Sequence, residues 1–277
     1  MGTALGVLWS RAGHRIVAAA GREHSRERVE RHLPGTPFLP AEEAAPLADV
    51  VVVAVPDDHI ADVADGLAAS GALQAHPWVV HLSGSTGLDA LDPAVAAGAR
   101  PLSLHPLQSF PDVETGIDRL PGSGIAVTAL TEEDALVGEG LAADAGGVPF
   151  RLEDQVKPLY HAAAVFCANY LVTVQGLAED ALLRAGVEDP LRLLAPLART
   201  AFDRTFALGP GVALTGPAVR ADVGTVERNL QALAERAPHA LDAYLALAEA
   251  AVHLAVSAGR LARGDGERVQ AALDRWR

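Results

Sequence analysis

Cysteine is nearly absent from this 277-residue chain. The single Cys167 excludes a disulfide framework and a cysteine-rich metal site, so we predict no metal centre, and we expect this residue to be a small core side chain in an apolar helix. Positive charge is also in deficit, because the net charge is −13, which argues against a nucleic-acid partner. No uninterrupted apolar run approaches the roughly 18 residues of a membrane span, and no basic leader precedes the apolar start. These absences are typical of a cytoplasmic protein with one large or two medium domains and no membrane partner.

Lysine is equally scarce, since Lys157 is the only lysine among 22 basic residues. Arginine stays charged, whereas a desolvated lysine can titrate, so a lone lysine is a candidate proton donor; chance survival is the alternative. Lys157 also opens a predicted helix, where the helix dipole lowers the pKa of a cation. His161 follows four residues later on the same face, so the two side chains can hold one polar substrate. Asn169 lies too far along the helix for a small substrate to touch both, and we expect a core hydrogen bond or a contact with a second subunit.

The first residues, MGTALG, read as the last third of a G-x-G-x-x-G turn in which Gly2 is the third glycine. Apolar residues at helical spacing follow, Gly13 is a helix stop, and Arg15 to Ala20 is a short apolar strand. In a doubly wound sheet the first strand is central. We therefore expect the first strand and two glycines to be missing because the start is assigned too late, which leaves a gap between residues 15–20 and the strand at Val50 to Val55.

The tip of the second strand carries the residues that read the adenosine ribose of a dinucleotide. Arg22 and Arg26 stand there and can hold a 2′-phosphate, so we expect NADP, with two solvated arginines as the alternative. NAD and a deazaflavin coenzyme stay open. We place the nicotinamide against Pro56 and Ser83. The predicted cofactor-binding residues are Gly2, Thr3, Arg22, Ser25, Arg26, Val55, Pro56 and Ser83.

The organisation of the chain changes once. Up to about residue 150, apolar strands alternate with helices, which predicts an α/β doubly wound parallel sheet of the Rossmann type over 1–150. After Asp154 the strand signals stop, so 151–277 is predicted to be an all-helical domain. The strands are expected at 49–56, 78–82, 100–104 and 124–130, and the helices at 58–69, 132–145, 158–185, 189–207, 222–236 and 239–262, with a short one at the end.

Ligands of open α/β sheets bind at the carboxyl ends of the strands. Asp57 or Asp58 follows one such end, and each is most simply a helix cap. The segment Ser83 to Ser85 follows another and is either a tight turn or a site for a carboxylate or phosphate. His105 ends a third strand, where it is either a group that exchanges a proton near pH 7 or a hydrogen-bonded structural histidine.

Three motifs resemble one known family: HPLQSF from His105, KPLYHAAAVFCANYLV from Lys157, and LTGPAVRADVGT from Leu214. They are similar to bacterial Rossmann-like proteins that carry a C-terminal domain of unknown function 2520, within the larger group of 6-phosphogluconate-dehydrogenase-like enzymes. The resemblance covers essentially the whole chain. It implies an N-terminal NADP domain followed by a helical dimerisation domain, and it leaves the substrate open.

Two wider resemblances suggest roles for single residues. The His-Pro pair at His105 is similar to the pair that lines the substrate pocket of prephenate dehydrogenases. Lys157 with His161 is similar to the lysine-x-x-x-asparagine pair of β-hydroxyacid dehydrogenases and ketopantoate reductases, where lysine donates the proton; here histidine replaces asparagine. In the third motif Arg220 can clamp a substrate carboxylate, although Asp222 beside it is explained equally well by a helix start.

The sequence thus predicts an NADPH-dependent oxidoreductase that reduces a small anionic carbonyl or imine compound, such as a 2-oxo acid of the ketopantoate kind. The predicted catalytic residues are Lys157, His105, His161 and Ser83, and Arg220 and Asn169 are predicted to bind substrate. A homodimer is expected through the helical domain. The alternative is a non-catalytic NADP-sensing module. A serine hydrolase is a more distant one, because residues 83–87 do not form a G-x-S-x-G elbow.

Overall fold

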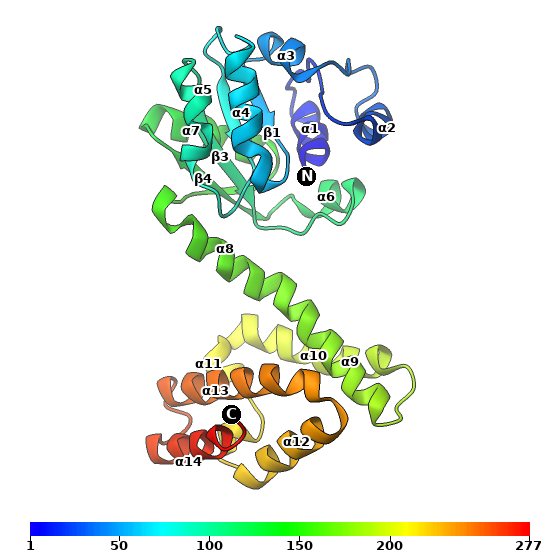
Figure 1. Ribbon diagram of the computed structural model, residues 1–277, viewed down its shortest axis with the longest axis vertical. Coiled ribbons are helices and arrows are strands. Elements are labelled where there is room, and N and C mark those ends of the chain that lie inside the picture. The colour runs from blue at the N-terminus through cyan, green and yellow to red at the C-terminus, as the bar shows by residue number, and fades with distance from the viewer. The chain divides into compact units, whose positions relative to one another are not determined.

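The computed structural model describes residues 1–277, which divide into two compact units, Met1–Ala168 and Asn169–Arg277. The first unit contains all the strands and is a sheet with helices on both faces (Figure 1). Its strands are β1 (Val50–Val53), β2 (Trp78–His81), β3 (Arg100–Pro106), β4 (Gly124–Ala129) and β5 (Val148–Arg151). Its helices are α1 (Gly2–Arg11), α2 (Glu23–His32), α3 (Ala41–Ala44), α4 (Ile60–Ala69), α5 (Asp92–Ala96), α6 (Val113–Arg119), α7 (Glu132–Asp144) and α8 (Lys157–Val165).

The five strands form one sheet in the order β1-β2-β3-β4-β5. All neighbours are parallel except β3 and β4, which pair antiparallel. The prediction of a wholly parallel sheet was therefore wrong at this pair. The connection from β3 to β4 carries only the short α6, which packs with α1 instead of crossing back over the sheet as a parallel connection requires. The short strand β5 was not predicted.

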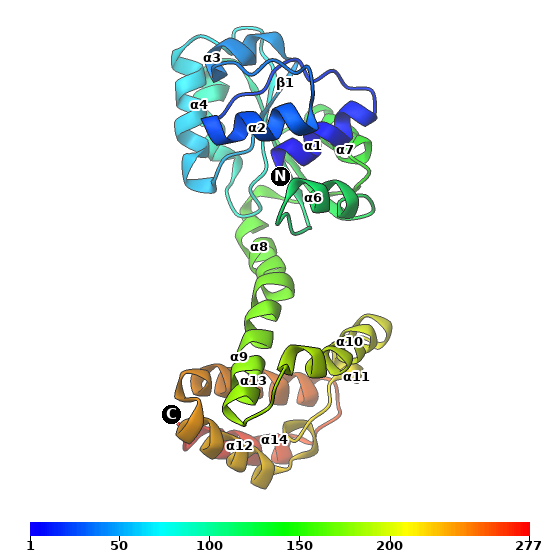
Figure 2. The ribbon, with the colours of Figure 1, turned by 90° about the vertical axis from the view of Figure 1, so that its right-hand side faces the viewer.

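Both faces of the sheet are covered, which explains the uninterrupted valine run of β1. On one face, Val53 and Val79 pack with Ile60 and Leu67 of α4. On the other face, Val80 packs with residues of α1, α6 and α7. Figure 2 shows α4 on one side of β1 and α1 with α7 on the other.

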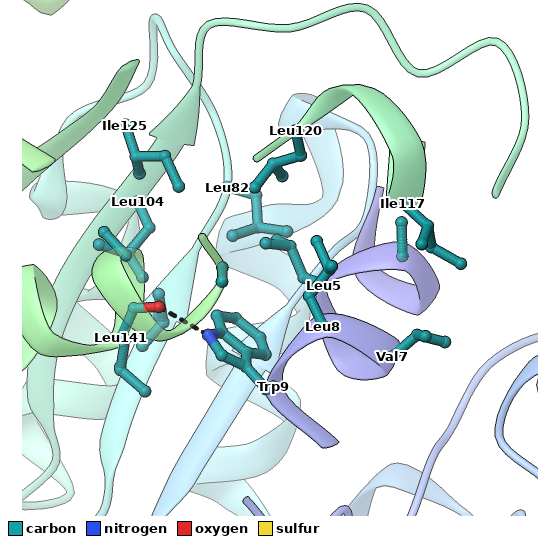
Figure 3. Close-up of a cluster of buried hydrophobic side chains, with 14 of the residues drawn as sticks. Leu5, Val7, Leu8, Trp9, Leu82, Leu104, Ile117, Leu120, Ile125 and Leu141 are labelled. Atoms are coloured by element: carbon teal, nitrogen blue, oxygen red, sulfur yellow. Dashed lines mark hydrogen bonds between the residues drawn. The ribbon is translucent and has the colours of Figure 1, made fainter. Parts of the chain in front are cut away.

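Helix α1 anchors the second of these faces (Figure 3). Leu5 and Leu8 are buried in the core, and the indole N–H of Trp9 donates to the carbonyl of Leu141 in α7 at 2.7 Å. Because a buried indole N–H needs an acceptor, this bond fixes α1 against α7. The helix begins at Gly2, and Gly13 follows it with a φ of 102°, as the sequence predicted.

The segment after α1 departs from prediction. Residues 15–20 were expected to form a strand, but only Ala19 makes a bridge, parallel to Phe38. The five-stranded sheet itself ends at β1. Residues 15–20 therefore form no ladder with the five-stranded sheet.

The second unit is helical, as predicted. Its helices are α9 (Leu171–Arg184), α10 (Pro190–Leu208), α11 (Pro210–Ala213), α12 (Val223–Arg236), α13 (Leu241–Ser257) and α14 (Arg263–Asp274). Its core joins α12, α13 and α14 through Val226, Leu230, Leu245 and Val269. A π-helical turn at Phe166–Tyr170 connects α8 to α9. Cys167 lies in this turn and is exposed, so the prediction of a core cysteine was wrong.

Two helical stretches, Asp154–Arg184 and Pro238–Ser257, are long and apolar enough to cross a membrane by length and composition alone. The count of uninterrupted apolar residues had indicated none. The criterion is a weak one, because core helices of globular proteins also meet it. Leu245, Val252 and Ala255 of the second stretch are buried in the core of the second unit.

Candidate active site

The loop that follows β2 is held from its first residue. The Ser83 side chain is 5% exposed, and its hydroxyl donates to Asp57 at 2.5 Å while accepting the backbone N–H groups of Ser85 and Thr86. The Ser85 hydroxyl donates to the same Asp57 oxygen at 3.1 Å. Asp57 therefore ties the end of β1 to the loop after β2. It caps no helix through its side chain, so the helix-cap interpretation was wrong.

Lys157 contacts this loop through its ammonium group. Its side chain is 1% exposed, and its ammonium donates to the Ser83 carbonyl at 3.0 Å and to the Ser103 hydroxyl at 2.7 Å. Burial lowers its pKa to about 8, against the raising effect of the Asp154 and Asp57 charges. The sequence predicted a lowered pKa but attributed it to the helix dipole. The structure places Lys157 as a cross-link between β2, β3 and α8.

His81 fills the space beside Lys157 and is fully buried. Its Nδ1 accepts the Ser83 N–H at 3.2 Å, so its Nε2 carries the proton of the neutral ring. That Nε2 is the one buried side-chain nitrogen or oxygen without a hydrogen-bond partner. Burial, with a further contribution from the Lys157 charge, lowers the pKa of His81 to about 3. His81 is thus a neutral packing partner of the buried ammonium.

Two histidine rings flank Gly84. A Cβ on this glycine would lie 2.6 Å from His161 Cδ2 and 2.7 Å from His105 Nε2, so no larger residue fits without moving a ring. The two rings are 5.8 Å apart between centroids. His105 Nδ1 lies 2.7 Å from the Tyr160 hydroxyl. With that hydroxyl donating, His105 presents its Nε2–H toward Gly84.

The titration predicted for His105 was wrong. Burial lowers its pKa to about 4, and the neighbouring His161 and Lys157 lower it further, so the ring is neutral at pH 7. Burial also raises the pKa of the Tyr160 hydroxyl above its ordinary value. When the Tyr160 hydroxyl donates to Nδ1 rather than to the His105 carbonyl at 3.3 Å, the pair offers one hydrogen-bond donor, His105 Nε2–H, rather than a ready acid.

The far end of the loop is held by the same segment that carries Lys157. Asp154 accepts the Leu88 N–H at 3.0 Å, and a Cβ on Gly87 would lie 2.9 Å from an Asp154 oxygen. Residues 83–88 are thus fixed at both ends by side chains from 154–157, together with Asp57. A loop fixed in this way is preorganised at the carboxyl edge of the sheet.

The predicted cofactor residues gather at a separate, adjoining part of this edge. A Cβ on Gly2 would lie 2.5 Å from Ala54 Cβ, so only glycine allows α1 to start this close to β1. A cavity of about 1190 Å³ opens there. It is lined by six of the eight predicted residues, namely Gly2, Thr3, Arg22, Ser25, Val55 and Pro56.

Arg26 and Ser83 do not line this cavity. Arg26 donates to Glu23 at 3.2 Å, and its guanidinium lies 4.6 Å from the centre of the Phe38 ring. Arg28 lines the cavity instead and donates to the Ser25 hydroxyl. Of the two predicted arginines, only Arg22 lines the cavity, and Arg28 lines it as well.

The predicted substrate residues belong to the second unit. Asn169 and Arg220 are both exposed, so the core role proposed for Asn169 was wrong, and a substrate contact remains a prediction for each. Asp222 caps α12 by accepting the Thr225 N–H at 3.1 Å, as its helix-start interpretation predicted.

Sequence reasoning missed Tyr160, Ser103 and Asp154. A signal existed for Ser103, because it alternates with His105 along an otherwise apolar strand and so shares a face with it. Tyr160 stands between Lys157 and His161 in the motif, but nothing in the sequence showed that its hydroxyl meets His105. That contact depends on how α8 docks beside β3.

Two family models match the chain. Residues 1–106 match a Rossmann-like domain, and residues 123–251 match the domain of unknown function 2520. This is the domain pair that the motifs predicted. No protein of curated function matches the chain in sequence.

Solved structures of several proteins share the fold. A Bacteroides fragilis protein, BF3122, described as a candidate NADP oxidoreductase, is 22% identical over 90% of this chain and 93% of its own, with a TM-score of 0.71. Protein TM1727 from Thermotoga maritima is 21% identical over 92% and 96%, with a TM-score of 0.67. An imine reductase from Myxococcus stipitatus in complex with NADP⁺ is 15% identical over 100% and 96%, with a TM-score of 0.67. At these identities the similarity shows the fold alone.

Proposed function

Because the chain belongs to the proteins that join a Rossmann-like domain to a domain of unknown function 2520, we propose that it is an NADPH-dependent reductase of a small anionic carbonyl or imine compound. The observation that carries this proposal is the loop at residues 83–88, fixed at both ends, with two histidine rings over Gly84. The NADP⁺ complex of the Myxococcus imine reductase, which has the same fold, supports the choice of cofactor and of reaction class.

The residues lining the cavity fit a phosphorylated dinucleotide. Gly2 lets the start of α1 approach closely, and a helix start is a favourable place for a pyrophosphate. Arg22 and Arg28 supply positive charge for a 2′-phosphate, and the Ser25 hydroxyl lies beside them. When bound, NADPH supplies the hydride of the reduction.

The chain's own residues then orient the substrate, and the proton that completes the reduction comes from solvent. His105 and His161 are the groups that can donate a hydrogen bond to a substrate oxygen or nitrogen over Gly84. Neutral His105 donates through Nε2–H, oriented by the Tyr160 hydroxyl at 2.7 Å. Lys157 acts as a positioning residue, because its donors are engaged with Ser83 and Ser103. A buried cation under the loop also favours an anionic substrate.

We also propose that the second unit serves this reaction. Arg220 would clamp a carboxylate and Asn169 would contact substrate or a second subunit. A 2-oxo acid of the ketopantoate kind and a cyclic imine carboxylate are the first substrates to test. We also expect the protein to be cytoplasmic.

The test is NADPH oxidation by the full chain across a panel of anionic 2-oxo acids and cyclic imines, with NADH in parallel. Removing both guanidinium groups in an Arg22→Ala, Arg28→Ala variant should weaken NADPH binding at least about 10-fold, because charge-assisted hydrogen bonds are lost, and should leave NADH binding unchanged. Arg31→Ala, an exposed position on the same helix outside the cavity, is the matched control. NADPH binding without oxidation of any member of the panel would favour the sensing module instead.

The same proposal includes a homodimer built on α9 and α10. Helix α9 buries no residue and α10 buries only Pro190, yet both carry large apolar side chains. Val172 is 72% exposed, Leu197 68% and Phe206 72%. Exposed apolar surface concentrated in this way is typical of a contact surface, and the family resemblance points to a second copy of the chain as its partner.

Light scattering after gel filtration measures this assembly. The wild type should have the mass of a dimer, and a Leu197→Glu, Phe206→Glu variant should have the mass of a monomer, because each buried carboxylate would be unpaired. Ala232→Glu adds the same charge at an exposed position of α12 and should stay dimeric. A monomeric wild type at micromolar concentration would contradict the proposal.

A further inference from the structure

The connection between β1 and α4, at residues 54–59, borders the cavity of about 1190 Å³. Most of its residues line that cavity, namely Ala54, Val55, Pro56 and His59. The connection is short and fixed at both ends, because Val53 before it and Ile60 after it are buried. Within it the His59 N–H donates to the Pro56 carbonyl at 2.9 Å, and the proline ring fixes its own φ. A ligand in the cavity therefore contacts a segment with little conformational freedom.

Asp57 belongs to this connection but does not line the cavity. Its Oδ2 atom instead accepts the Ser83 hydroxyl at 2.5 Å and the Ser85 hydroxyl at 3.1 Å, in the loop at residues 83–88. The other side chains bonded to this loop, among them Lys157 and Asp154, come from segments that do not line the cavity. Asp57 is therefore the side-chain link between the wall of the cavity and the loop.

Ser83 carries this link into the backbone of the loop. Its buried hydroxyl donates to Asp57. The same hydroxyl accepts the N–H groups of Ser85 at 3.2 Å and Thr86 at 2.9 Å. A hydroxyl that donates to a carboxylate is also a stronger acceptor, so the three bonds reinforce one another. They close a turn around Gly84, which the two histidine rings flank, so the Asp57 carboxylate holds the turn on which those rings lie.

We propose that Asp57 is a positioning residue that couples the cavity to the loop: a dinucleotide seated against Val55 and Pro56 orders the turn around Gly84 through the Asp57 carboxylate. The identity of the ligand in the cavity rests on the proposed function. Coupling is reciprocal, so the ordered turn also strengthens dinucleotide binding. An Asp57 with a merely structural role would hold the turn equally well with and without the dinucleotide. The change that NADPH causes in the turn is therefore the quantity to measure.

Hydrogen exchange at the Ser85 and Thr86 amides of the full chain is measured with and without NADPH, at concentrations that give equal saturation in every variant. In the wild type NADPH should slow exchange at both amides at least about 5-fold, because the turn opens less often once it is ordered. In Asp57→Ala this change should vanish. In Asp57→Asn it should be reduced, because a neutral amide oxygen accepts the two hydroxyls more weakly than a carboxylate. Asp58→Ala, at an exposed neighbouring position that does not line the cavity, is the matched control and should keep the full change.

A fluorescence titration with NADPH, run on each variant, separates this proposal from the proposed function. NADPH binding to the wild type without slower exchange at Ser85 and Thr86 would overturn the coupling and leave the proposed function standing. An undiminished change in Asp57→Ala or in Asp57→Asn would overturn the coupling as well, and Asp57→Asn decides alone if Asp57→Ala does not fold. Absence of NADPH binding to the wild type would overturn the cofactor assignment, and the coupling with it.

Discussion

The two compact units differ in their side chains: the first buries polar and charged residues, and the second exposes large apolar ones. The six buried polar or charged residues all belong to the first unit, and His81, Ser83, Ser103 and Lys157 form one cluster among them. The second unit buries no such residue but exposes large apolar side chains along α9 and α10. Buried polar groups are costly unless bonded, and exposed apolar surface is costly unless covered. The first unit therefore has the features of a reaction site, and the second unit has the features of a contact surface.

The largest expected effect separates the core of the second unit from its exposed face. Leu230 in α12 is fully buried, and Leu230→Ala should lower the free energy of unfolding by about 2–5 kcal/mol. Leu197→Ala in α10, 68% exposed, should change it by less than about 0.5 kcal/mol in dilute, monomeric protein. Urea unfolding measures both. Equal losses of unfolding free energy would mean that α10 belongs to the core of the second unit and that the dimer contact does not lie on it.

Next in size is the effect of crowding the two histidine rings. Gly84→Ala should lower turnover about 100-fold, because its Cβ would lie within 2.8 Å of both rings. Gly66→Ala in α4, where a Cβ meets nothing within 4 Å and which does not line the cofactor cavity, is the matched control and should keep full activity. Steady-state kinetics with the substrate of the panel that is turned over fastest measures this effect. Full activity in Gly84→Ala would remove the rings from the site.

Removing the hydroxyl acceptor of the buried ammonium should have a smaller effect, on stability. Ser103→Ala should cost about 1–3 kcal/mol, because Lys157 would keep only the Ser83 carbonyl as a partner. Ser10→Ala, at an exposed position of α1, should be neutral. If Ser103→Ala and Ser10→Ala unfold at the same denaturant concentration, the Ser103 hydroxyl does not bind Lys157 as the distances indicate.

The smallest effect for a single step is the change in stability per pH unit. The pKa of His81 is about 3 in the folded chain and has its ordinary value of 6.5 in the unfolded chain, so between these values the unfolded chain binds a proton that the folded chain does not. Stability should therefore fall as pH drops below about 6.5, by about 1.4 kcal/mol per pH unit for each such histidine. His81→Gln should flatten this slope, whereas His253→Gln, at an exposed position of α13, should not. An unchanged slope in His81→Gln would contradict the burial of a neutral ring.

Much of the fold followed from local patterns. The valine run of β1 and the glycine stop at Gly13 were predicted because strand length and turn chemistry are local properties. The antiparallel β4 was not, since strand direction depends on where the chain travels between strands.

The sequence identified several residues of the candidate site, but it predicted their roles less well. Lys157 and His105 were both singled out, yet the pKa of His105 is about 4 rather than near 7, because packing of α8 desolvates the ring. Tyr160 was missed for the same reason. Burial is a property of the assembled fold, and no spacing in the sequence reports it.

Lys157 holds the loop and, in addition to burial, lowers the pKa of the histidines beside it. Lys157→Met preserves the length of the side chain and removes its charge, and the measurement combines turnover with an NMR titration of His105. We expect turnover to fall about 100-fold or more with NADPH affinity kept, because the loop below the two histidine rings would be misplaced. We also expect the pKa of His105 to rise, because the Lys157 charge lowers it. Unchanged turnover together with an unchanged His105 pKa would contradict the account.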